Sequence, residues 1–127
     1  MNLPLGPQSP GISLSVIPAA SSVAPEAQAS SEAWFPVIGS DLDVTNLRTA
    51  AFTIINSGAN TLQWRIVGAL LPTFADQVVV LAAEDVVAAD SNAYAESAAP
   101  YRFYRVEIQD KVAGNHSTAN VRGYAKG

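Results

Sequence analysis

The sequence predicts an all-β protein, an antiparallel β-sandwich that carries an extended, proline-rich N-terminal arm. Short segments with alternating apolar and polar residues follow one another closely, with turn residues between them, which is typical of sandwiches. No 3.6-residue apolar period is sustained long enough to indicate a helix. Five of the eight prolines lie before residue 34, and proline excludes a long helix or a central strand from that part of the chain.

The length and composition of the chain limit what it can be. With 127 residues it is one domain, long enough to bury a core. Apolar residues make up 49% and charged residues 14% of the chain, which argues against a fully disordered protein. A net charge of −4 disfavours nucleic-acid binding through phosphate neutralisation. The chain has no cysteine and one histidine, which excludes disulfides, thiolate sites and a multi-histidine metal site within one chain.

Residues 1–33 form the expected arm. They contain only two charged residues, and their prolines favour an extended or irregular conformation. Residues 12–16 alternate like a short edge strand. We expect the arm to become ordered on a partner; the alternative is a loose tail with one strand folded back on its own domain. The apolar residues expected to bind the partner are Leu3, Leu5, Ile12, Leu14, Val16 and Ile17.

Residues 34–127 form the expected sandwich domain, of immunoglobulin-like or jelly-roll-like type. Clusters with Asn and Gly at 56–60 and 111–118 predict hairpin loops. The continuous apolar run 78–81 is consistent with a strand buried on both faces, and residues 84–92 fit a turn, a short helix or the start of a strand. The expected strands are residues 51–55, 62–68, 78–81, 101–109 and 119–125.

Alternation along these strands sorts the large side chains into a core set and a surface set. Trp64 and Tyr104 share their strand faces with aliphatic residues, so we expect both in the core. Arg65 and Arg105 lie on the opposite faces and are expected to meet Glu107 across strands, on a solvated surface. The residues expected to form a contact face are Tyr101, Phe103, Arg105 and Tyr124.

The carboxylates and the single histidine form no recognisable catalytic or metal-binding pattern. Asp41 and Asp43 supply too few oxygen ligands for calcium. Glu84 and Asp85 are typical of a soluble surface rather than of a paired-carboxylate site. His116 lies in an expected hairpin loop, and no serine has a nucleophile motif around it. We therefore expect no enzyme activity and no catalytic, cofactor-binding or metal-binding residues.

No segment predicts secretion or membrane insertion. No basic residue precedes Arg48, and prolines interrupt the apolar residues near the N-terminus, so a signal peptide is not expected. The longest apolar runs fall far short of the roughly 20 residues of a membrane-spanning helix. The chain is expected to be soluble, without membrane or nucleic-acid partners.

Three stretches of the chain resemble a known group of proteins. Residues 53–64 combine a strand, an Asn/Gly loop and the strand that carries Trp64. Residues 99–108 contain Pro-Tyr-Arg-Phe-Tyr-Arg-Val, and residues 119–127 end in Val-Arg-Gly-Tyr-Ala-Lys-Gly. Together they are similar to small β-sandwich structural proteins of tailed bacteriophages, especially capsid decoration (cement) proteins.

The resemblance implies a non-enzymatic virion protein that binds the outer capsid surface, often as a trimer, where capsid subunits meet. Its partner would be the major capsid protein or another virion protein, and its arm would reach a neighbouring subunit. It would be made in the host cytoplasm and reside on the virion. Two alternatives stay open: a head–tail, tail or fibre-base adaptor, and a carbohydrate-binding module in which Trp34, Tyr101 or Tyr124 stacks on a sugar.

Overall fold

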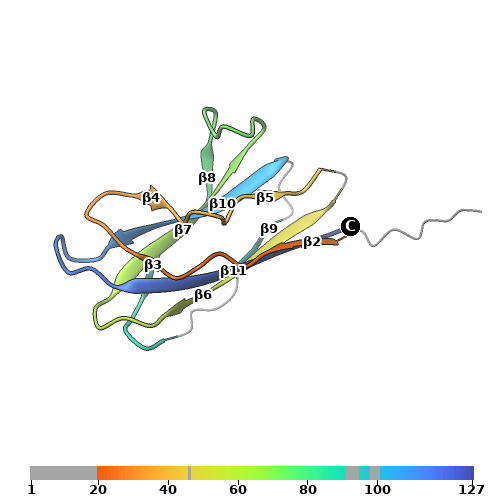
Figure 1. Ribbon diagram of the computed structural model, residues 1–127. Helices are drawn as coiled ribbons and strands as arrows, with labels where there is room; N and C mark the ends of the chain where they lie inside the picture. The colour runs from red at the N-terminus through yellow and green to blue at the C-terminus, as the bar shows by residue number, and fades with distance from the viewer. Residues whose placement is uncertain (1–19, 46, 91–94, 98–100) are drawn as a thin grey trace, which may run out of the picture.

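The computed structural model describes residues 20–45, 47–90, 95–97 and 101–127. Within these residues the regular elements are all β-strands, and they form two antiparallel sheets arranged as a sandwich (Figure 1). The predicted fold class, an all-β antiparallel β-sandwich, is therefore confirmed.

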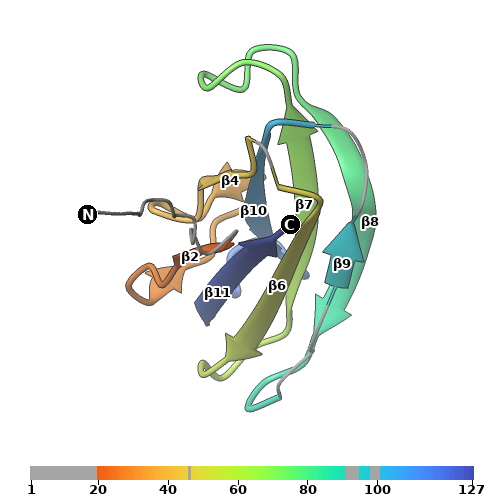
Figure 2. The same ribbon diagram turned by 90° about the vertical axis from the view of Figure 1, so that its right-hand side faces the viewer.

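The two sheets are named after their central strands. The β7 sheet contains β4 (Phe35–Pro36), β5 (Leu42–Asp43), β7 (Leu62–Ala69), β8 (Val78–Val86) and β10 (Phe103–Asp110). The β6 sheet contains β2 (Ala20–Val23), β3 (Gln28–Ala29), β6 (Thr49–Asn56), β9 (Ala95–Ser97) and β11 (Thr118–Lys126). The strand orders are β4-β10-β7-β8 and β2-β11-β6-β9, with β5 also on β10 and β3 also on β11. Figure 2 shows β8 and β9 at one side of the sandwich and β2 and β4 at the other.

The hydrophobic core lies between the inner faces of the sheets and consists of alternate residues of the long strands. Its largest side chains are Trp64, Tyr104 and Phe52, all fully buried, so the prediction that Trp64 and Tyr104 belong to the core is confirmed. Gly123 of β11 leaves room for Phe52, because a Cβ at this position would lie 2.6 Å from the phenyl ring. Each such large apolar side chain contributes about 1.5–3 kcal/mol through burial.

The position of β8 corrects one prediction. Residues 78–81 do form part of a strand, but the prediction that they are buried on both faces is wrong. β8 is the last strand of its sheet, and Val78 and Val79 are 43% and 50% exposed. An apolar run identifies a strand without identifying its neighbours, because sheet order depends on residues distant in the sequence. β8 continues to Val86, which decides between the alternatives at residues 84–86 in favour of a strand.

Two short strands lie within the first 33 residues, the segment expected to form the arm. β2 pairs with the C-terminal part of β11, and β3 pairs with its first residues. Residues 20–29 therefore take part in the β6 sheet. The arm is predicted at residues 1–33. Its part at residues 1–19, with the expected partner-binding residues from Leu3 to Ile17, lies outside the described residues and stays a prediction.

Asn56, the last residue of β6, connects the two sheets through its buried side chain. Its Nδ2 donates to the carbonyl oxygens of Asn60 (2.8 Å) and Val86 (2.7 Å). Its Oδ1 accepts hydrogen bonds from Gly58 N (3.0 Å) and Ser117 Oγ (2.6 Å). The amide thus binds the end of β8 in one sheet and the residue before β11 in the other, and its own polar atoms are fully satisfied.

We expect Asn56→Ala to lower the free energy of unfolding by about 3 kcal/mol, because it leaves buried partner groups without hydrogen bonds. Urea unfolding of the full-length chain measures this loss. Asn120→Ala is the matched control: the Asn120 amide donates to Ser57 Oγ in an exposed position, and its loss should cost less than about 0.5 kcal/mol. Equal losses in the two variants would show that Asn56 does not connect the sheets.

Candidate functional site

The outer face of the β7 sheet carries a buried ion-pair network centred on Glu107. Arg65 lies opposite Glu107 in the β7–β10 register, and its Nη2 and Nε lie 2.6 and 2.8 Å from Glu107 Oε1. Arg105 Nη2 (3.4 Å) and Gln77 Nε2 (3.3 Å) donate to Glu107 Oε2. The predicted contact of Arg65 with Glu107 across strands is therefore confirmed. Arg105 also contacts Glu107, but from two residues away on the same strand β10, so for Arg105 the prediction of a cross-strand contact is wrong.

Aromatic side chains cover this network, so the prediction of a solvated surface is wrong. The centre of the Trp34 ring lies 4.4 Å from the guanidinium carbon of Arg65, and that of Phe74 lies 4.2 Å from the guanidinium carbon of Arg105. Glu107 is only 4% exposed. Trp34 precedes β4 and Phe74 belongs to the β7–β8 loop, so both lie outside the strands. Alternation along the strands therefore could not predict that these two rings lie over the arginines.

The structure does not bring the four expected contact residues onto one surface. Tyr101 packs against the hydrophobic core, and Phe103 packs against Phe74 in a smaller apolar cluster. Arg105 belongs to the ion-pair network. Tyr124 lies on the other sheet and is 49% exposed, which makes it the most accessible of the four. Their role in partner binding stays a prediction.

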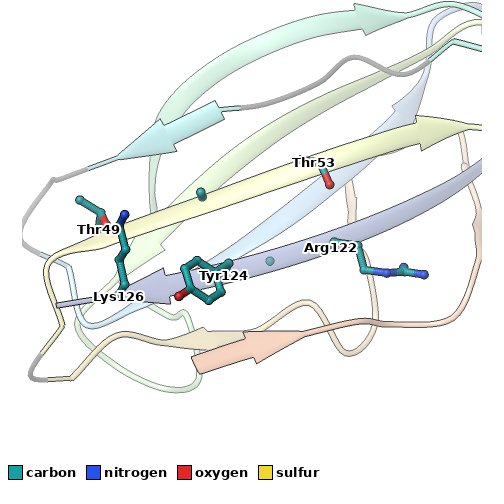
Figure 3. A pocket seen from close by; sticks show the side chains of 7 residues that line it. Thr49, Thr53, Arg122, Tyr124 and Lys126 are labelled. Carbon is teal, nitrogen blue, oxygen red and sulfur yellow. The ribbon is translucent and has the colours of Figure 1, made fainter. Parts of the chain in front are cut away.

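The outer face of the β6 sheet is open and forms a shallow hollow of about 170 Å³ (Figure 3). Small residues of β6 lie there beside long residues of β11, because the register pairs Thr49 with Lys126, Ala51 with Tyr124 and Thr53 with Arg122. A row of short side chains next to a row of long ones leaves the hollow between them. This surface, the cationic face, is lined by Thr49, Ala51, Thr53, Arg122, Gly123, Tyr124 and Lys126.

The cationic face holds positive charge that no carboxylate neutralises among the described side chains. No ion pair among the described side chains includes Arg122, Lys126 or the adjacent Arg48. The chain as a whole is nevertheless acidic. Tyr124 lies between the two cations of β11 (Figure 3), and Glu96 of β9 occupies the register position beside Ala51. The surface is suited to an acidic partner.

Tyr124 is the residue of this surface that was expected in a contact face. Period-two alternation along β11 is the signal for Arg122 and Lys126, since both share the phase of Tyr124. The small residues opposite them follow only from the pairing of β6 with β11.

Ser30, Asp110 and His116 come together, but without the geometry of a catalytic triad. Ser30 Oγ (2.5 Å) and His116 Nδ1 (2.8 Å) both bind the Asp110 carboxylate, whereas a nucleophilic serine would bind the histidine. Gly114 N donates to the same carboxylate (3.2 Å), and Ser117 N donates to Ser30 Oγ (2.9 Å). The cluster attaches the segment after β3 to the β10–β11 loop.

The other acidic residues show no metal site. Asp43 Oδ1 accepts hydrogen bonds from Thr45 N (2.8 Å) and Thr45 Oγ1 (2.6 Å), which closes a local turn. Across residues 20–45, 47–90, 95–97 and 101–127, no group of three or more His, Cys, Asp or Glu residues is placed to hold a metal ion.

The same part of the chain contains no helix that is long and apolar enough to cross a membrane.

The β7–β8 hairpin projects from the sandwich (Figures 1 and 2), and its loop exposes apolar side chains. Asp76 holds its loop in place by accepting hydrogen bonds from Leu70 N (3.0 Å) and Leu71 N (3.2 Å). Phe74 is buried beneath the loop with a positive φ of 60°. Leu70 and Leu71 remain about half exposed. The apolar tip consists of Leu70 and Leu71.

Comparisons with known proteins identify the fold but no family. No family model and no curated protein matches the chain. The crystal structure of the SPBc2 prophage-derived protein YomS is similar with a TM-score of 0.55 and 12% identity, over 92% of this chain and 100% of that one. A structure of Bacillus endospore appendages, which form a novel family of disulfide-linked pili, is similar with a TM-score of 0.51 and 13% identity, over 84% and 86% of the two chains. These similarities show a shared fold, and the present chain has no cysteine for a disulfide link.

The Asp110 cluster predicts a loss of stability in acid. Burial of the Asp110 carboxyl group acts to raise its pKa, but hydrogen bonds from Ser30, His116 and Gly114 outweigh this effect and lower the pKa. A lowered folded-state pKa stabilises the protein above the unfolded-state pKa, and this contribution is lost as the pH falls through the folded-state pKa. Asp110→Asn should therefore cost about 1–3 kcal/mol at neutral pH and flatten the decline in stability below about pH 4.

Urea unfolding at neutral pH and at about pH 3 measures both effects. Glu26→Gln is the control, because Glu26 is exposed and its variant should keep the wild-type dependence on pH. A decline in Asp110→Asn as steep as in the wild type would exclude Asp110 as its source.

Proposed function

We propose that the chain is a non-enzymatic structural protein of a tailed-bacteriophage virion, a capsid decoration protein. It binds the outer capsid surface and stabilises contacts between major capsid subunits, partly through its N-terminal arm. The resemblance of residues 53–127 to decoration proteins supports this role, and the fold shared with a prophage-derived protein is compatible with it.

The observation that carries the proposal is the apolar tip on the projecting β7–β8 hairpin. Leu70 and Leu71 are exposed on a loop that Asp76 and the buried Phe74 already hold in one conformation. A preorganised apolar loop loses little conformational entropy on binding, so most of its buried area contributes to affinity. Projecting aliphatic side chains of this kind suit insertion between neighbouring subunits.

A second contact comes from the arm. The first described strand, β2, lies on the side of the sandwich away from β8 (Figure 2), and the arm is proposed to make a contact separate from that of the apolar tip. Contacts at two separated places allow one copy to bridge two capsid subunits, with Leu3, Leu5, Ile12, Leu14, Val16 and Ile17 as the arm's contribution. Repetition over a shell makes weak individual contacts collectively strong, and a homotrimer suits a site of three-fold symmetry.

An adaptor of the head–tail junction, tail or fibre base uses the same fold at another place in the virion. The carbohydrate-binding alternative depends on Tyr124, the exposed aromatic ring of the hollow. Both stay alternatives to the decoration role.

Co-sedimentation with shells assembled from the major capsid protein alone tests the role of the tip. Leu70→Ser combined with Leu71→Ser should weaken shell binding at least about tenfold, because it removes the aliphatic contact area. Val112→Ser is the matched control: Val112 is an exposed aliphatic residue of the β10–β11 loop, and its variant should bind as the wild type does. A wild-type chain that binds tail structures but not shells would contradict decoration and support the adaptor.

The arm is tested in the same assay with Ile12→Ser combined with Leu14→Ser. These substitutions keep the chain length and the strands β2 and β3, so unfolding of the β6 sheet does not confound the result. We expect a loss of shell binding of at least about tenfold. Full binding by this variant would show that the arm is not a contact.

A further inference from the structure

We propose that the cationic face of one copy binds the β8 edge of a second copy, so that the chain assembles head to tail. This inference rests on the proposed structural role. It extends that role by naming a second copy as a partner and the two surfaces that form the interface. The β8 edge consists of the exposed β8 residues Val78, Val79, Ala82, Ala83, Glu84 and Asp85.

The cationic face offers two kinds of contact at once. Arg122 and Lys126 are exposed and take part in no ion pair among the described side chains. Tyr124 adds exposed aromatic area, and Ile55, which lies opposite Asn120 in the register, adds exposed aliphatic area on the same side of the sheet. A matching partner surface presents carboxylates next to aliphatic side chains.

The β8 edge has this composition. β8 is the terminal strand of the β7 sheet, and its first half exposes Val78 and Val79. Its second half carries Glu84, which is exposed and makes no ion pair with the described side chains, and Asp85, which pairs with Lys111 at 3.2 Å. Aliphatic contact area and negative charge thus lie on one continuous strand.

The charge distribution favours a second copy as the partner. The chain has eleven acidic and seven basic residues, and three of the basic ones, Arg48, Arg122 and Lys126, lie on or beside the cationic face. Glu107 and Asp110 are buried and Glu96 lies beside the cationic face, which leaves eight acidic and four basic residues elsewhere. The rest of the chain therefore has an excess of acidic residues, so a second copy presents the complementary charge. Because the two surfaces lie on different sheets of one rigid sandwich, a copy cannot satisfy its own cationic face.

The pairing of β8 with β7 decides the mode of contact. Register shifts interrupt the ladder between Trp64 and Ile66 and again between Ile66 and Val67. Irregularities of this kind bend an edge strand and disfavour pairing with another strand. The β8 edge therefore engages the cationic face through side chains rather than by extending a sheet.

Two different surfaces in contact produce a heterologous interface. Such an interface forms a ring when the rotation between copies closes, and an open filament when it does not. A closed ring of three is the outcome compatible with the homotrimer in the proposed function.

Light scattering of the full-length chain after size exclusion, over a range of concentrations, tests the proposal. We expect self-association that weakens between about 50 and 500 mM NaCl, because exposed charges are screened. Arg122→Glu with Lys126→Glu should weaken it at least about tenfold, and so should Glu84→Lys. A chain carrying both Arg122→Glu and Glu84→Lys should recover association, because the exchanged charges attract again.

Arg102→Glu is the matched control, since Arg102 is exposed and lies next to β10 of the other sheet, where its Nε donates to Thr45 Oγ1 (3.1 Å) and its charge acts on Asp43, away from both proposed surfaces. Its association should equal that of the wild type. Circular dichroism and thermal unfolding establish that each variant folds, as expected for substitutions at exposed positions.

A wild-type chain that stays monomeric up to about 1 mM would overturn the proposal, as would a charge exchange that fails to restore association.

Measuring shell binding of the same variants distinguishes a failure of self-association from a failure of the proposed function. If the Arg122→Glu chain loses shell binding while wild-type mass stays that of a monomer, the cationic face binds capsid protein and self-association is overturned. If oligogalacturonate binds a monomeric wild type and not Arg122→Glu, an acidic saccharide replaces the second copy. If the charge exchange restores self-association but the wild-type chain does not bind shells, the head-to-tail inference is supported and the proposed capsid decoration role is contradicted.

Discussion

The buried side-chain amide of Asn56 is the interaction on which the mutual arrangement of the two sheets depends. Hydrophobic burial of Phe52, Trp64 and Tyr104 brings the inner faces together, but it is not directional. The amide supplies direction, because its four hydrogen bonds bind the end of β8, the β6–β7 turn and the start of β11 at one end of the sandwich. Fully satisfied polar groups of this kind specify one packing among the many that hydrophobic contact alone would allow.

The outer faces of the two sheets have different physical roles. On the β7 sheet, the desolvated Glu107 carboxylate is stable only while Arg65, Arg105 and Gln77 remain in place. Trp34 and Phe74 lie over the two arginines and cover this surface. The contact of Phe74 with Arg105 attaches the β7–β8 loop to the sheet, and the covered side chains are not available to a partner. On the β6 sheet nothing among the described residues covers the hollow beside Tyr124. The partner contacts that we propose for the described residues therefore lie on the cationic face, the β8 edge and the apolar tip.

These three surfaces differ in the interactions they offer. The apolar tip presents aliphatic side chains on a preorganised loop, and its contribution to binding would be insensitive to salt. The cationic face and the β8 edge combine charge with apolar area, and their contribution would fall as ionic strength rises. A chain with both kinds of surface can be held in an assembly under conditions that weaken one of them.

Local patterns in the sequence determined the fold class, the strands β6, β7, β10 and β11, the core positions of Trp64 and Tyr104, and the ion pair of Arg65 with Glu107. Each follows from period-two alternation, which is encoded within a few residues. The tertiary structure alone decided that β8 is an edge strand, that Trp34 and Phe74 cover the Glu107 network, and that Tyr124 lies on a different sheet from Phe103 and Arg105. These features depend on which distant segments meet, and a strand's own residues encode its two faces but not the neighbours that cover them.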